Sequence, residues 1–254
     1  MKVLSFFIKG KMAHFRRFYS NSSSLTYTIP PRTTICGILA GLMGWERDSY
    51  YEQFSCINCG IAVAAKSPIK KLVQTVNLLK VESINELNGS SGFHTQTATE
   101  VLMPYNIRKQ DICYQVWLSH KNADIMDKLK HNIISHQPCY LSSGITLALG
   151  TAYNTGWIEY IGEFEGQILE TGNISARIIS SIPQKTIKEI DIKNMFNADY
   201  RLIREEIPLE FDNERRLKSG SLCNMIFDLN GNPLPVVVDK CVQLDNGDTI
   251  AWME

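Results

Sequence analysis

The sequence lacks a hydrophobic segment long enough to cross a membrane. The apolar run within residues 35–43 is about ten residues long, whereas a membrane-spanning helix needs about twenty. The apolar residues Val3–Ile8 are too few for the core of a signal peptide, and lysines follow them at once. We therefore expect a buried first strand at Val3–Ile8, no membrane association and a cytoplasmic protein.

The cysteine spacings that mark a disulfide framework or a zinc site are also missing. The seven cysteines are odd in number and scattered through apolar stretches, which indicates reduced thiols. Cys56 and Cys59 form a CxxC pair, but neither a second pair nor a suitably spaced histidine follows. His131 and His136 are five positions apart and so do not share one face of a helix. We expect no metal and no cofactor.

Acidic residues are absent from the first forty-five positions, which contain six lysines and arginines, although the formal net charge of the chain is zero. A uniformly basic nucleic-acid binder is therefore excluded, and any such surface must be local. Between these cations lie His14, Phe15, Phe18, Tyr19 and Tyr27. Clustered cations attract phosphates and aromatic rings stack on unpaired bases, so the pattern indicates a surface for single-stranded nucleic acid. The alternative is a solvated basic face with core aromatics.

A helix is predicted directly after this stretch. Pro30-Pro31 suits a helix start, Thr33 or Thr34 can cap the first turn, and Gly44 stands just past the expected end. Between them, apolar residues recur at positions 35, 38, 39, 42 and 43, which is helical spacing. The free N–H groups of the first turn, the two threonines and Arg32 would form a phosphate site.

In order, the sequence has a short strand, Lys9-Gly10, then AHFRRFYS, TYTIPPRTT and GILAGLMG. This order resembles the N-terminal motif of the Cas-five family of CRISPR-associated proteins, in the RAMP superfamily. A second stretch, HTQTATEVLMPYNI, is similar to a glutamine-and-glutamate motif that these proteins have before a strand. Only about the first forty-five residues match in a motif-like way.

The hydrophobic pattern predicts an α+β fold. Strands are expected at residues 3–8, 57–65 and 112–119, with helices at 35–43 and 122–134. Asn122 is the expected cap of the second helix, and either Tyr140–Gly150 or Trp157–Phe164 supplies the next strand. This is the order of a ferredoxin-like (RRM-like) domain. Residues 88–111 are polar and have a turn cluster, so they are expected to leave the domain as an extended hairpin, the thumb of the family that the chain resembles.

The C-terminal part has a different pattern. Asn230-Gly231 and Asn246-Gly247 each lie between apolar runs, which is typical of tight hairpins. We expect a first domain at residues 1–206 and a small β appendage at 207–254. Residues 186–254 have a net charge of −5, from 13 acidic and 8 basic side chains. Such a region suits protein partners better than phosphates, or is simply solvated.

The resemblance implies a non-catalytic guide-RNA (crRNA) binding subunit of a type I CRISPR surveillance complex (Cascade), of the type I-B kind. It would hold the 5′ handle of the guide and cap the backbone filament in antiviral defence. Its implied partners are the crRNA, the filament subunit, the large target-recognition subunit and possibly target DNA. The expected RNA-binding residues are Lys9, Lys11, His14, Phe15, Arg16, Arg17, Tyr19, Tyr27, Arg32, Thr33, Thr34, Gln96, Thr97 and Arg108.

Two other functions stay open. A metal-independent endoribonuclease that processes CRISPR repeat RNA needs an acid and a base, for which His14, His94, Tyr27, Lys9 and Lys11 are candidates. RNA-binding surfaces contain these residue types without catalysis, so we expect no enzyme. The other alternative is a plain RNA-binding domain outside any CRISPR complex.

Overall fold

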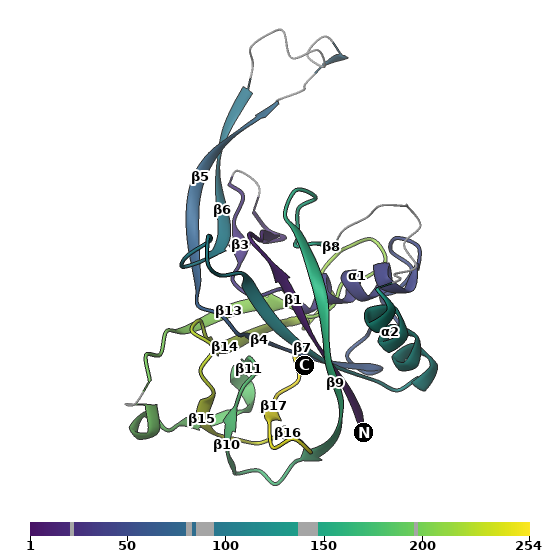
Figure 1. Cartoon of the computed structure of the whole chain (residues 1–254), viewed down its shortest axis with the longest axis vertical. Helices are drawn as coiled ribbons and strands as arrows, with labels where there is room; N and C mark the ends of the chain where they lie inside the picture. The colour runs from purple at the N-terminus through teal and green to yellow at the C-terminus, as the bar shows by residue number, and fades with distance from the viewer. Residues whose placement is uncertain (21–22, 80–82, 85–93, 137–146, 196–197) are drawn as a thin grey trace.

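The structure, a computed structural model, describes residues 1–20, 23–79, 83–84, 94–136, 147–195 and 198–254. Within these ranges, two α-helices lie beside a curved arrangement of strands, which confirms the expected α+β class (Figure 1). None of the helices in these ranges is long and apolar enough to span a membrane.

Four antiparallel strands form the centre of the fold, in the order β9–β1–β7–β4. They are β1 (Lys2–Gly10), β4 (Cys59–Ala65), β7 (Ile112–His120) and β9 (Thr155–Leu169). Along the chain, strands, helices and an inserted hairpin follow one another in the predicted order. The fourth strand comes from the Trp157–Phe164 stretch. Of the competing stretch, residues 140–146 lie outside the described ranges, and β8 (Leu147–Ala148) pairs with β9.

Helix α1 (Arg32–Met43) begins and ends at the predicted prolines and glycine. Gly44 has φ 71°, in the left-handed region, and its N–H bonds back to the last turn of the helix. The expected threonine cap is wrong, because Pro31 is the N-cap residue and no side chain caps the first turn. Helix α2 (Ala123–Ser135) has the predicted cap, since Asn122 Oδ1 accepts from the Asp124 N–H at 2.9 Å.

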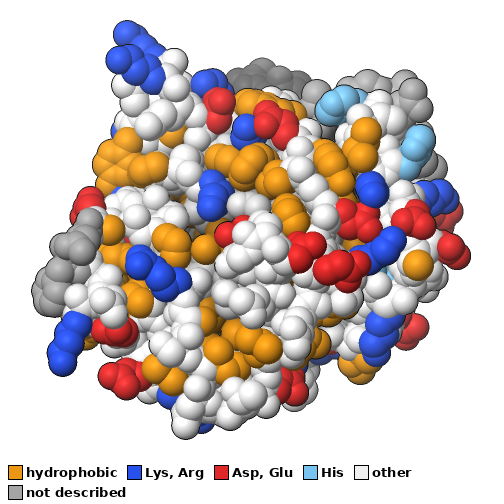
Figure 2. Space-filling model, turned by 60° about the horizontal axis from the view of Figure 1, so that its bottom comes forward, with side chains coloured by type: hydrophobic (Ala, Val, Ile, Leu, Met, Phe, Trp, Pro, Cys, Tyr) orange, Lys and Arg blue, Asp and Glu red, His pale blue; other side chains and the backbone are white. Residues whose placement is uncertain are grey.

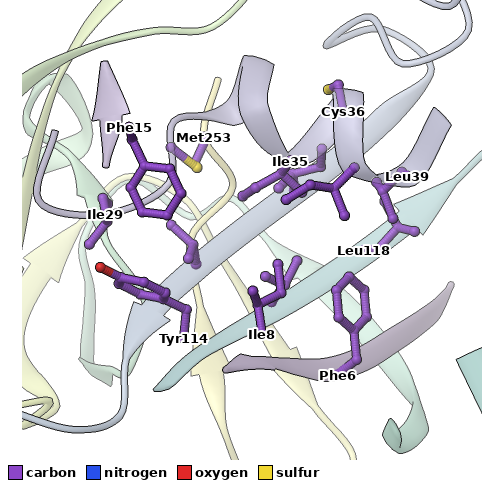
Figure 3. Packing of buried hydrophobic residues seen from close by; sticks show 14 of the residues in the cluster. Phe6, Ile8, Phe15, Ile29, Ile35, Cys36, Leu39, Tyr114, Leu118 and Met253 are labelled. Atoms are coloured by element: carbon purple, nitrogen blue, oxygen red, sulfur yellow. The ribbon is translucent and has the colours of Figure 1, made fainter. Parts of the chain in front are cut away.

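Both helices pack on one face of the central sheet. Figure 3 shows Phe6 and Ile8 of β1 and Leu118 of β7 facing Ile35 and Leu39 of α1, all almost fully buried. The alternate residues of the same strands point to the other face, as in any β-strand. A second buried cluster covers that face and includes residues near the C-terminus: Val3, Ala62, Trp117, Val242, Ile250 and Trp252.

A long antiparallel hairpin leaves the body between β4 and β7 (Figure 1). It consists of β5 (Ile69–Leu79) and β6 (His94–Pro104), paired from Ile69↔Pro104 to Leu79↔His94, and we call it the arm. The predicted thumb, residues 88–111, includes only its returning strand, and residues 88–93 lie outside the described ranges. The sequence does not distinguish the outgoing strand, because its apolar residues alternate as they do in a strand of the body.

The C-terminal strands continue from the central sheet through β9. Strand β9 is long enough to pair with β1 along its first part and with β16 along its end. The predicted boundary at 206/207 falls inside β13. The strands of this part are β10 (Ile174–Ile178), β11 (Ile182–Pro183), β12 (Ile187–Ile190), β13 (Leu202–Pro208), β14 (Leu222–Asp228), β15 (Leu234–Val238), β16 (Cys241–Leu244) and β17 (Thr249–Ile250), with 3-10 helices at Gln184–Thr186 and Ile192–Met195.

One of the two predicted Asn-Gly hairpins is present. Asn246-Gly247 joins β16 to β17, which pair with each other, and Gly247 has φ 90°. Asn230-Gly231 does not join a hairpin, because β14 pairs with β13 and β11 whereas β15 pairs with β10 and β12. The turn itself is present at this position, but the strands on its two sides belong to different sheets.

Candidate nucleic-acid interface

The basic loop, residues 11–28, lies against the base of the arm. Ala13 pairs with Leu102 and Ser24 with Thr99 in isolated bridges, and these residues join the loop to β6. Within the loop, β2 (Phe15–Arg16) pairs with β3 (Thr26–Tyr27). The described residues on both sides of the loop are thus held by the arm that they contact.

His14 is a buried anchor of this loop. Its side chain is 2% exposed, with Nδ1 at 2.6 Å from the Glu100 carbonyl oxygen and Nε2 at 3.0 Å from Ser24 Oγ. The His14 N–H donates to the Leu149 carbonyl, and a Cβ on Gly150, which has φ 94°, would lie 1.9 Å from the His14 carbonyl oxygen. Leu149 and Gly150, at the end of the Tyr140–Gly150 stretch, therefore contact the basic loop at His14.

Phe15 and Tyr27, expected on an RNA-binding surface, are core residues with 1% exposure. Phe15 contacts Tyr114 edge-to-face at 5.9 Å between ring centroids. Burial raises the pKa of the Tyr27 hydroxyl well above its usual range. Large apolar rings are more stable inside than exposed, so these two side chains hold the loop on the sheet and do not present ring faces.

Two carboxylates bind the loop from outside it. Glu205 of β13 is 5% exposed and accepts hydrogen bonds from Arg17 Nη2 and from the Thr28 N–H. Glu100 of β6 accepts from the Thr26 N–H at 2.8 Å and forms an ion pair with Lys71 at 3.2 Å. The carboxylates neutralise part of the basic loop, an interaction that the charge pattern of the first forty-five residues could not reveal.

Arg32 is likewise not a surface cation. It is 1% exposed, and its guanidinium donates to the carbonyl oxygens of Cys59 at 2.7 Å and Leu209 at 3.2 Å. In this conformation the charge of the expected phosphate ligand points into the protein. Thr33 and Thr34 beside it are half-buried.

The other expected residues are at the surface. Arg16 and Lys11 are exposed, and Lys11 Nζ is 2.6 Å from Asp111 Oδ1, just beyond Arg108. Gln96 and Arg108 are exposed and Thr97 is half-exposed. Lys11 bonds the Gln110 carbonyl and Lys71 that of Thr26, so the basic loop, the base of the arm and the turn after it are joined, whereas Gln96 lies further out along the arm. The exposed cations of these three segments are Lys11, Arg16, Lys71, Arg108 and Lys109.

Lys9 lies on the sheet face opposite the helices. Its Nζ is 2.5 Å from Glu159 Oε2 and 5.0 Å from the centroid of the Phe7 ring. The hydrogen bond to Glu159 raises the pKa of Lys9 and lowers that of Glu159. Asp111, the ion-pair partner of Lys11, also raises the pKa of Lys9, so the two lysines lie near the same carboxylate.

Two exposed or half-exposed aromatics, Phe18 and Phe211, belong to the same region and are not among the expected site residues. The Phe18 and Tyr19 side chains retain 45% and 50% exposure, and Phe18 contacts Phe211. Phe211 is the one aromatic residue among residues 201–220, which are strongly charged. A single aromatic residue in such a stretch is the sequence feature from which its place in the site could have been predicted.

The described residues offer no group of three or more His, Cys, Asp or Glu side chains that could hold a metal. Cys56 and Cys59 are free thiols, and burial raises the pKa of both, to about 11 for Cys56. On the face in Figure 2, acidic and basic side chains are interspersed and neither sign covers a large area, so this face offers no extended surface for phosphates.

A family model described as CRISPR-associated protein (Cas_Cas5) matches residues 3–109 of the chain. No curated protein matches the sequence significantly. The crystal structure of a CRISPR protein from Archaeoglobus fulgidus aligns over 98% of both chains, with 13% identity and a TM-score of 0.57, and so has the same overall fold.

Two further solved structures are less similar. A CRISPR RNA-guided surveillance complex matches over 91% of both chains, with 14% identity and a TM-score of 0.49. A Type III-B Cmr-beta structure matches over 94% of this chain and 86% of the other, with 13% identity and a TM-score of 0.47. Neither score is high enough to support a conclusion. The family match includes the basic loop, α1 and the arm, so this N-terminal part of the chain is similar to the Cas5 family of CRISPR-associated proteins.

Proposed function

We propose that the protein is a crRNA-binding subunit of a type I Cascade complex, of the I-B kind, that holds the 5′ handle and caps the backbone filament. The family match over residues 3–109 is the main support, because it includes the basic loop and the arm. The filament subunit and the large target-recognition subunit are the proposed protein partners, and the cytoplasm is the proposed location.

The order of the central strands supports an RNA-recognition scaffold. In the sheet β9–β1–β7–β4, the first strand lies between the fourth and the third, and one helix follows each of the first and third strands. This is the order of a ferredoxin-like domain, which we infer here and which many RNA-binding modules use. The scaffold alone does not imply function, so the proposal depends on the surface that it supports.

That surface is the exposed part of the basic loop together with the base of the arm. Lys11 reaches the carbonyl oxygen of Gln110 and Lys71 that of Thr26, so the loop, the arm and the turn after it are joined. Arg16 and Arg108 remain exposed on it. Cations held on ordered backbone beside exposed rings suit a bent single strand, whose phosphates and bases are both accessible.

The states of the candidate acids and bases support a binding role without catalysis. Both ring nitrogens of His14 have partners and its side chain is buried. Tyr27 is buried, and Lys9 is paired with Glu159. A group that transfers protons to RNA must reach the 2′-hydroxyl or the leaving oxygen, and none of these three does so in this conformation.

Binding of repeat RNA from the host's own CRISPR locus tests the proposal. Reversal of Arg16 and Arg108 to Glu should weaken binding and reduce the magnitude of the log–log salt slope by about one unit for each phosphate that is no longer neutralised. The matched control reverses Lys128 and Lys185, two exposed lysines away from the loop, with the same change in charge. Equal effects of the two pairs would contradict a local site.

A further inference from the structure

Three aromatic rings meet where the basic loop approaches the segment after β13. Phe18 contacts Tyr19 at 5.3 Å between centroids with an interplanar angle of 85°, and Phe211 at 6.0 Å with an angle of 74°. Phe18 is 45% exposed and Tyr19 50%, and Phe211 is half-buried. An edge-to-face contact uses one ring face in each pair, so ring faces stay open to solvent. Contiguous exposed rings indicate a binding site.

The cluster is held in place by charged side chains. Arg17 Nη1 donates to the Tyr19 hydroxyl at 2.6 Å, and the same guanidinium is bonded to the buried Glu205. Tyr19 is therefore connected through Arg17 to β13, the strand that leads to Phe211. An ordered ring loses less conformational entropy on binding than a mobile one.

Cations flank the rings on both segments. Arg16 is exposed next to the aromatic pair, and the Arg216 side chain, which follows Phe211 in a tight turn, is 76% exposed. Glu214 pairs with Arg216 at 2.6 Å, and Asp212 accepts from the backbone N–H groups of Glu214 and Arg216. Arg216 is thus largely neutralised by Glu214, and Asp212 keeps its negative charge, so Arg16, which has no carboxylate partner among the described residues, is the cation beside the rings that suits a phosphate.

We propose that Phe18, Tyr19 and Phe211 form a stacking site for an unpaired nucleotide of the crRNA handle, with Arg16 beside its phosphate. This inference rests on the proposed RNA-binding function and adds a location and a ligand class to it. Every base has a π-face, so such a site holds a nucleotide without reading its identity. A protein partner is the other possible occupant. A nucleotide and a protein differ in what they require of residue 18, because an aliphatic side chain suffices for apolar contact with a protein but not for stacking on a base.

The experiment compares Phe18→Leu with Phe18→Trp, using handle RNAs that carry 2-aminopurine at one position at a time. We expect fluorescence quenching at one or two adjacent positions with the parent protein. Phe18→Leu should abolish the quenching and weaken binding about tenfold, and Phe18→Trp should retain both. Phe211→Leu should act like Phe18→Leu. Because Phe18 is exposed, its replacement should leave the melting transition unchanged. The Phe18 variants alone therefore decide the result, and Phe211→Leu is secondary because Phe211 is half-buried and contributes to packing.

The outcomes separate this inference from the function on which it rests. RNA binding that is weakened by the reversal of Arg16 and Arg108 but unchanged by Phe18→Leu, with no quenched position, would overturn the stacking site and leave the proposed function standing. Loss of binding to partner subunits in Phe18→Leu, with RNA binding intact, would assign the rings to a protein interface and also overturn it. Absence of any binding to handle RNA by the parent would overturn both.

Discussion

Arg17 donates from Nη2 to Oε1 of Glu205, a residue 188 positions further along the chain. The other carboxylate oxygen of Glu205 accepts from the Thr28 N–H at 2.8 Å. One buried acid thus holds a cation and a backbone amide of the basic loop at once. The acidic C-terminal part, which the charge count alone assigns to protein partners, here orders the basic N-terminal part.

Replacement of Glu205 by Gln should destabilise the protein by about 2 kcal/mol, because the charge-assisted bond to Arg17 is removed while the amide can still bond Thr28. Urea unfolding measures the change. Glu206→Gln is the matched control, since Glu206 is the exposed neighbour on the same strand and should change stability by less than about 0.5 kcal/mol. Equal stability of the two variants would show that Glu205 does not hold the loop.

The contrast between local and long-range features explains what the sequence could predict. The first strand, both helices with the Asn122 cap and the Gly44 end, and the order of the central elements follow from periodicity and capping, which act within a few residues. The Asn246-Gly247 hairpin is equally local. The prediction of a hairpin at Asn230-Gly231 is wrong because strand pairing depends on distant segments.

The same reasoning applies to the candidate site. That the N-terminal stretch contains a basic loop could be inferred from charge alone, and Arg16, Lys11 and Arg108 are exposed as a binding role requires. Burial of Phe15, Tyr27 and Arg32 could not be inferred, because aromatic and cationic side chains occur in the core as well as at RNA-binding surfaces when partners are present. The partners of Arg32 are carbonyl groups, which no sequence pattern identifies.

Replacement of Arg32 by Met should reduce stability by roughly 2–4 kcal/mol, because it leaves the Cys59 and Leu209 carbonyls without a donor in the interior. At a temperature where the variant is folded, its RNA-binding salt slope should equal that of the parent, since the number of neutralised phosphates does not change. Thermal melting and a salt titration measure the two effects. A lower salt slope with unchanged stability would restore the phosphate-binding role that the sequence suggested.

The outer arm should be dispensable for folding. Replacement of residues 76–97 by Asn-Gly would close β5 and β6 with a two-residue turn and leave Glu100 and Leu102 in place. Most described side chains of the removed part are exposed, so the melting temperature should change by only a few degrees. RNA binding or complex assembly should be weakened, as measured by co-purification with crRNA and the other subunits.

A deletion that extends into the arm base is the control for this variant. Removal of residues 95–109 takes away Glu100, which bonds Thr26 and His14, and the buried Val101 and Leu102. That protein should unfold at a much lower temperature. If instead the outer-arm variant also collapsed, the outer arm would be structural, and weaker RNA binding by that variant could not be assigned to lost contacts of the arm.

The last prediction separates RNA binding from RNA cleavage. A metal-independent ribonuclease would cut repeat RNA in EDTA and leave a 2′,3′-cyclic phosphate, and loss of its acid or base would slow cutting about a hundredfold or more. With purified protein in excess over labelled repeat RNA, we expect no product band, because His14 is buried with both ring nitrogens engaged. His14→Asn should then act on folding, since it removes the hydrogen bonds to Glu100 and Ser24, and full-length guide should still form when a separate nuclease is present. His94 belongs to the same test, although its side chain lies outside the described part of the chain. Robust cleavage by the parent that disappears in His14→Asn or His94→Asn would show that the loop or the arm opens to expose a catalytic residue, and the binding-only function would have to be abandoned.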